Sequence, residues 1–151
     1  MKKIFLILFC LFYSNAVADV YQAKSFKCNY YYMAIGEIKN NKYKIDTSKE
    51  DKMGFSYVNI DLINGSAQMV GNGGTANVTA IGAQPSGVHF VEMTSAGNLT
   101  MTTIYPQEIG YNSLGQKLFS SSHSRHMAMI NNSLPQQYYG QCALMEWIGI
   151  F

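Results

Sequence analysis

The residues best suited to chemistry gather in one short segment, Ser120–His126, which reads Ser-Ser-Ser-His-Ser-Arg-His. Successive side chains of a β-strand point to opposite faces, so a strand here places His123 and Arg125 on one face and His126 on the other. A guanidinium donates paired hydrogen bonds to anions, and a histidine titrates near neutral pH. The segment therefore predicts a site for an anionic or polar ligand. The alternative is a polar outer surface with one interior histidine bonded to hydroxyl groups.

Two tyrosines are expected beside this segment. The turn-forming residues Asn131–Pro135 predict that Tyr138 and Tyr139 return on an antiparallel neighbouring strand, although tyrosines in strands are also ordinary packing residues. An enclosed Arg125 would need an anionic partner, because a buried unpaired charge is costly, and Glu92, Glu108 or a ligand are the options. The candidate ligand-binding residues are therefore His123, Arg125, His126, Tyr138 and Tyr139.

Other chemistries find less support in the sequence. His123 and His126 would face opposite sides of one strand and cannot bind the same ion, and the methionines are scattered at strand positions, as core filler is. We expect neither a metal nor a cofactor. The chain has no Gly-x-Ser-x-Gly element, no His-Glu-x-x-His motif and no phosphate loop. We therefore expect a non-catalytic protein, with a secreted hydrolase as the least favoured alternative.

The N-terminus has the features of a secretory signal peptide. Lys2 and Lys3 precede the apolar run Ile4–Phe12, and Ala16-Val17-Ala18 is a small-x-small cleavage site. The apolar run is far shorter than the roughly 20 residues that a membrane-spanning helix needs. We expect residues 1–18 to be removed and residues 19–151 to form one exported domain, periplasmic or secreted, without a membrane anchor.

Charge and cysteine content narrow the class of protein further. The formal net charge of +2 is matched by the two lysines of the leader, so the exported chain is neutral. A neutral chain has no electrostatic reason to bind nucleic acid. Removal of the leader also removes Cys10, which leaves Cys28 and Cys142. Two cysteines in an exported domain predict one disulfide.

Apolar and aromatic residues recur at every second position, which indicates β-strands. The even positions from Phe26 to Tyr32 predict a first strand over 24–33, and Asn64-Gly65 predicts a hairpin with a type I′ turn. Further strands are expected over 57–62, 66–70, 75–81, 88–95, 98–105, 116–130 and 138–145. Between them, 39–52 is expected to be a charged, solvated segment that could hold a short helix or hairpin, and 106–115 the longest loop of the second half.

Seven or eight strands with short connections predict an antiparallel meander. A disulfide requires the two Cα atoms to lie within about 7 Å of each other. A bond from Cys28 in the first strand to Cys142 in the last therefore makes these strands neighbours. The sequence predicts an all-β protein, an up-and-down barrel that is closed or nearly closed.

Three segments resemble small exported bacterial proteins of unknown function: Asn98–Ile104, Ser122–His126 and Gln137–Cys142. The resemblance implies an exported, disulfide-bearing, β-rich protein and adds no activity. The architecture is also similar to lipocalin-type barrels, but by analogy alone. The early Gly-x-Trp element of that family is missing, and the single tryptophan is Trp147.

These features predict an exported binding protein for a small molecule or a protein partner, bound at the barrel mouth or on one sheet face. The alternative is a structural or interaction protein, such as an inhibitor of a secreted enzyme, acting through 39–52 or 106–115. An open barrel interior would favour the binding protein. A filled core with an exposed tyrosine patch would favour the interaction protein.

The cleavage signal makes a first prediction. The exported protein should begin at Asp19, because Ala16 and Ala18 occupy the two small-residue positions of the signal. Intact-mass measurement of the exported protein checks this. A mass that includes residues 1–18, or a lipid on Cys10, contradicts it.

Overall fold

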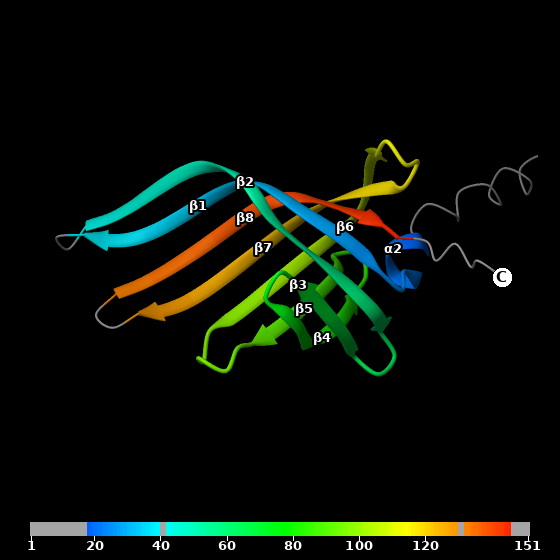
Figure 1. Cartoon of the computed structure of the whole chain (residues 1–151), viewed down its shortest axis with the longest axis horizontal. Helices are drawn as coiled ribbons and strands as arrows, with labels where there is room; N and C mark the ends of the chain where they lie inside the picture. The colour runs from blue at the N-terminus through cyan, green and yellow to red at the C-terminus, as the bar shows by residue number, and fades with distance from the viewer. Residues whose placement is uncertain (1–17, 40–41, 130–131, 146–151) are drawn as a thin grey trace, which may run out of the picture.

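Eight antiparallel strands form a closed barrel in which each strand pairs with its neighbours in sequence (Figure 1). The computed structural model describes residues 18–39, 42–129 and 132–145. A short helix, α2 (Ala18–Gln22), precedes β1 (Phe26–Lys39), β2 (Lys42–Asp61), β3 (Ser66–Gly71), β4 (Gly74–Ala83), β5 (Gly87–Met93), β6 (Leu99–Tyr111), β7 (Lys117–Met129) and β8 (Asn132–Leu144). The predicted all-β, up-and-down barrel is confirmed. Residues 1–17 of the expected signal peptide, and Trp147, lie outside the described residues.

The barrel closes where the first strand pairs with the last. Cys28 of β1 lies directly opposite Cys142 of β8, and the two are joined by a disulfide. Both cysteines are fully buried. Close approach of the strands also requires a glycine two residues before Cys142, since a Cβ on Gly140 would collide with the backbone of Asn29 and Tyr30. The predicted neighbourhood of the first and last strands is confirmed.

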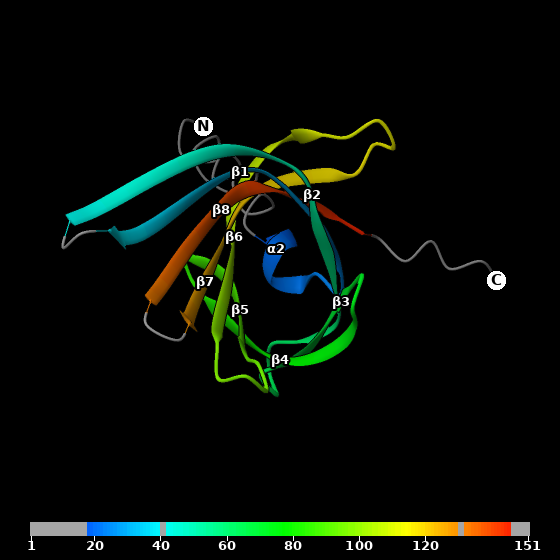
Figure 2. The same cartoon turned by 60° about the vertical axis from the view of Figure 1, so that its left-hand side comes forward.

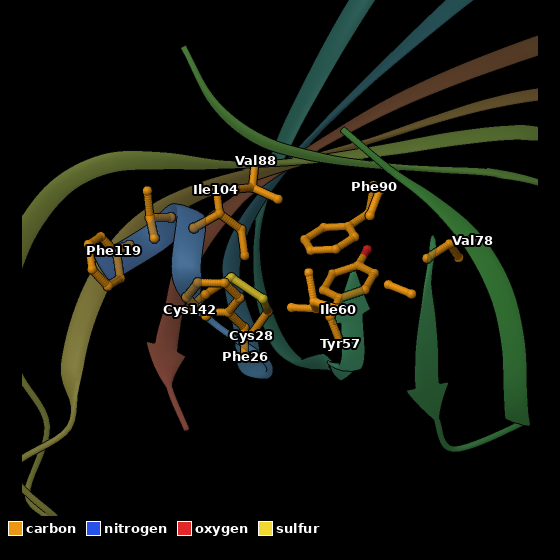
Figure 3. Packing of buried hydrophobic residues seen from close by; sticks show 14 of the residues in the cluster. Phe26, Cys28, Tyr57, Ile60, Val78, Val88, Phe90, Ile104, Phe119 and Cys142 are labelled. Atoms are coloured by element: carbon orange, nitrogen blue, oxygen red, sulfur yellow. A yellow bond between two sulfur atoms is a disulfide. The ribbon is translucent and has the colours of Figure 1, made fainter. Parts of the chain in front are cut away.

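One end of the barrel is filled by apolar side chains and by α2. Helix α2 lies inside the ring of strands (Figure 2), and its Val20 is only 2% exposed. The apolar side chains around the disulfide come from many strands, as Figure 3 shows: Phe26, Ile60, Val88, Ile104 and Phe119. Above them Tyr57 stacks on Phe90 with ring centroids 3.8 Å apart. No helix in the described part of the chain is long and apolar enough to cross a membrane.

The long hairpins β1–β2 and β7–β8 continue past the barrel as a projecting sheet (Figure 1). We call this projection, residues 33–39, 42–52, 126–129 and 132–136, the wing. Residues 42–49 are exposed, as expected for the charged segment, but they form strand β2 and not a loop. Of the two possibilities that the sequence allowed for this segment, a short helix or a hairpin, the structure has the hairpin. Strand β8 likewise begins at Asn132 and not near Tyr138, which lengthens the second hairpin.

The expected loop at 106–115 is mostly strand. Strand β6 runs to Tyr111, and only 112–116 connect it to β7. Pro106 sits where the β6–β7 register shifts, between Ile104 and Glu108. A proline lacks the N–H that a regular ladder needs, but a bulge leaves that position unpaired. The proline therefore interrupts the pairing without ending the strand.

Two local details also differ from the sequence-based expectation. The hairpin at Asn64-Gly65 forms, but its turn spans four residues, and Gly65 alone has a positive φ, so it is not type I′. The Asp61 carboxylate accepts hydrogen bonds from the backbone N–H groups of Ile63 and Asn64, which stabilises this wider turn. In β1 a bulge between Tyr30 and Tyr32 turns Tyr32 to the outer face, where it is 60% exposed.

The disulfide should make a large contribution to stability. It closes a sequence separation of 114 residues, which on the chain-entropy account is worth roughly 4–5 kcal/mol at most. The double variant Cys28→Ala/Cys142→Ala should therefore unfold at clearly lower urea concentration than the oxidised protein. Thiol titration of the unreduced, denatured protein should find neither cysteine free. Two reactive thiols, or an unchanged unfolding midpoint, would contradict this prediction.

Candidate functional site

The end of the barrel opposite α2 is open. A pocket of about 480 Å³ lies there, within the range of roughly 300–1,000 Å³ that is typical of small-molecule sites. Its walls combine apolar and charged side chains from five strands: Met53, Phe55, Met69, Ala76, Glu92 and Arg125. The barrel is therefore packed at one end and hollow at the other.

The opening arises because the β3–β4 hairpin separates from its neighbours near its tip. β2 pairs with β3 only from Ser56 onward, and β4 pairs with β5 only from Thr79 onward. The glycine-rich tip, 71–74, then lines the pocket. A second pocket, of about 420 Å³, lies beside the first and shares Met53, Gly54 and Phe55 with it.

Polar side chains form a row on one wall of the barrel mouth. Glu92 of β5 lies opposite Thr100 of β6, and Thr100 lies opposite Arg125 of β7. The Thr100 hydroxyl donates a hydrogen bond of 3.3 Å to the Glu92 carboxylate. The register of three adjacent strands thus places a carboxylate and a guanidinium on the same wall.

Arg125 is half-buried, and its guanidinium lies over the ring of Tyr138, 5.6 Å from the ring centroid. Among the described residues, no carboxylate is within salt-bridge distance of it. Glu108, one of its two expected protein partners, lies 3.8 Å from Lys117. Glu92, the other, shares the pocket but bonds to Thr100. Arg125 therefore presents its charge to the pocket with an aromatic neighbour and, within the described ranges, without an ion pair.

His123 lies one inward-facing position below Arg125 and is almost fully buried, with 2% of its surface exposed. Its Nδ1 is 2.7 Å from the Thr102 hydroxyl, which accepts a hydrogen bond of 2.7 Å from the Tyr57 hydroxyl. The ring also contacts Phe55, at a centroid distance of 5.0 Å. This is the interior histidine bonded to hydroxyl groups that the sequence allowed as the alternative.

The interior of the barrel is uncharged around His123. Burial, with a smaller contribution from the nearby Arg125 charge, lowers the pKa of His123 to about 3. Burial also raises the pKa of Tyr30 to about 12 and that of Tyr57 still higher. Because the Thr102 hydroxyl oxygen already accepts from Tyr57, we assign its proton as the one donated to Nδ1 of His123. Nδ1 is then the acceptor, and the proton of the neutral imidazole is on Nε2. That nitrogen is buried and has no hydrogen-bond partner in the described part of the structure.

The five candidate residues divide between the two faces of the sheet. His123, Arg125 and Tyr138 point inward and lie together. His126 is exposed on the outer face, and Tyr139, paired with Ser122, is 50% exposed there. The period of two explains the division, since adjacent residues cannot share a face in a regular strand.

Several pocket residues were not found from the sequence. Met53 and Phe55 of β2 lie between the segment expected to be solvated, 39–52, and the strand expected from residue 57, so they were assigned to no element. Met69 and Ala76 looked like ordinary strand residues. The sequence did contain a signal for Glu92. Val88, Phe90 and Glu92 occupy every second position of β5, so they share the inward face of the strand, and the Glu92 carboxylate lies on that face.

The described residues contain no group of three histidine, cysteine or acidic side chains that could hold a metal ion. A comparison of the chain with protein families, curated proteins and solved structures finds no match. The geometry of the barrel mouth is therefore the basis for assigning a function.

The buried histidine predicts acid sensitivity. His123 has a folded-state pKa of about 3, whereas its unfolded value is about 6.5. Between these values the unfolded state binds a proton that the folded state does not, so stability falls as the pH decreases. At pH 5 the free energy of unfolding should be roughly 2 kcal/mol lower than at neutral pH.

Urea unfolding at several pH values checks this. His123→Gln should remove most of the decrease in the free energy of unfolding between pH 7 and pH 5, which is roughly 2 kcal/mol in the wild type. His126→Gln, an exposed change three residues along the same strand on the outer face, should leave this pH dependence as in the wild type. Equal slopes for all three proteins would show that His123 is not responsible.

Proposed function

We propose that this protein is an exported, non-catalytic binding protein whose barrel mouth holds a small amphipathic molecule. The observation that carries the proposal is the division of the barrel into a packed half and an open half. A barrel whose only task is to be a stable scaffold has no need of a pocket of about 480 Å³ with charged side chains on its wall. The closed, disulfide-bonded end supplies the rigid support that a pre-formed site needs.

The composition of the pocket supports an amphipathic ligand. Met53, Phe55 and Met69 offer apolar contact surface, and methionine adapts to ligands of different shape. Arg125 and Glu92 can orient a polar head group. The buried His123 bonds to Thr102 and packs among aromatic rings, which suits a structural role below the pocket.

Export is part of the proposal. A disulfide persists in oxidising compartments, so the Cys28–Cys142 bond fits a periplasmic or secreted protein. The signal-peptide pattern of residues 1–18 points to the same compartments.

A second candidate function is protein recognition by the outer face of the wing. Tyr43 is 88% and Ile45 74% exposed, and Tyr32 and Tyr139 lie on the same outer surface nearer the barrel. Exposed aromatic side chains are frequent anchors of protein interfaces. In this case 39–52 would act as a strand hairpin and not as the loop expected for an inhibitor.

Binding of the amphipathic anion 8-anilino-1-naphthalenesulfonate separates these candidates. We expect one molecule to bind per barrel, measured by fluorescence and calorimetry. Ala76→Trp, which places a large ring in the pocket, should weaken binding at least tenfold. Asn77→Trp, on the outer face of the same strand, should not.

Circular dichroism should show both variants folded. Unchanged binding by folded Ala76→Trp would overturn the pocket as the site. Loss of binding in Tyr43→Ser instead would place the probe on the wing and favour protein recognition.

A further inference from the structure

The pocket wall carries two side chains of opposite charge, Glu92 and Arg125, on either side of strand β6. Glu92 and Arg125 are separated by one strand, β6, so their Cα atoms are about 10 Å apart. Among the described residues they form no ion pair with each other. Each has its own neighbour instead, since Glu92 accepts from Thr100 and Arg125 lies over Tyr138.

Two opposite, half-buried charges in a pocket constrain the ligand. A ligand with a negative group alone satisfies Arg125 but brings that group towards the Glu92 carboxylate. A ligand with a positive group alone meets the reverse conflict with Arg125. An uncharged ligand displaces water from both groups without replacing its hydrogen bonds, which costs free energy. Only a ligand that carries both charges compensates both side chains.

We infer that the pocket selects a zwitterion with an apolar side chain, in the chemical class of a free amino acid or a short peptide. The ligand carboxylate would lie at Arg125 and the ammonium group at Glu92. The apolar side chain would lie against Met53, Phe55 and Met69 on the opposite part of the lining. This inference rests on the proposed binding function, which it narrows to one ligand class.

The pattern of charges also predicts discrimination against close relatives of the ligand. Blocking either charged end of an amino acid leaves one pocket charge without a partner, and a desolvated charge without a partner costs binding free energy. Acetylation of the amine should therefore be penalised by Glu92. Amidation of the carboxylate should be penalised by Arg125.

Three probes with the same ring test the inference on the full exported chain. Phenylalanine is the zwitterion, N-acetylphenylalanine the anion and phenylalaninamide the cation. Calorimetry or ligand-observed NMR should show phenylalanine binding at least five times more tightly than either of the others. Arg125→Gln should remove the preference over phenylalaninamide, and Glu92→Gln the preference over N-acetylphenylalanine.

Matched controls lie outside the pocket lining. Lys49→Gln in the wing and Glu108→Gln on β6 remove the same charges elsewhere and should leave all three affinities unchanged. Thermal unfolding should establish that each variant is folded. The comparison of three probes with the wild-type protein tests the inference even where a variant fails to fold.

The outcomes separate this inference from the proposed function. Equal or tighter binding of N-acetylphenylalanine or phenylalaninamide overturns selection of a zwitterion. Absence of binding for all three probes also overturns it. The proposed pocket then stands if the naphthalenesulfonate still binds to the wild-type protein and binds more weakly to the Ala76→Trp variant. If that dye also fails to bind in the pocket, the proposed function itself is wrong.

Discussion

The structure depends on the pairing of its first strand with its last. This contact joins residues far apart in sequence, and its loop-closure cost is reduced by the disulfide between Cys28 and Cys142. Closure leaves the barrel without free sheet edges in its body, which matters for a β-rich protein. Gly140 lets β8 approach the backbone of β1 at the bulge beside Tyr30. That bulge sends Tyr31 and Tyr32 together to the outer surface and so separates the barrel from the wing.

The interior changes character along one strand. The inward side chains of β7 are Phe119 in the apolar end, then Ser121, His123 and finally Arg125 at the pocket. Between the two ends lies a layer of neutral hydrogen bonds, including Tyr30 to Ser121 and Thr102 to His123. Buried polar groups are stabilising only when they are paired, and Nε2 of His123 is the buried side-chain atom of this layer that finds no partner among the described residues. A neutral, bonded layer allows an apolar core and a charged pocket to share one small barrel.

The wing and the pocket have a common structural cause. β2 is far longer than β3, so its first part has only β1 as a neighbour, while the end of the β3–β4 hairpin leaves the barrel wall open. Unequal strand lengths thus produce both the projecting sheet and the mouth. The wing exposes tyrosine and isoleucine side chains, whereas the mouth encloses apolar side chains with two opposite charges. The mouth is the surface better suited to a small molecule, because side chains from five strands line a single hollow there.

Local patterns in the sequence determined the central part of each strand, the hairpin at Asn64-Gly65, the partnership of the two cysteines and the opposite orientations of His123 and His126. These features follow from a period of two and from covalent geometry, which act over a few residues. The expected bond between Cys28 and Cys142 was also sufficient to predict that the first and last strands pair and close the barrel. Tertiary structure alone decided that Arg125 and Glu92 lie on one wall on either side of β6, with no ion pair to Arg125 in the described part of the chain. It also decided that Tyr139 points away from the site and that one end of the barrel is hollow. Such properties depend on strand register, bulges and unequal strand lengths summed around the whole barrel, and no single segment of the sequence encodes them.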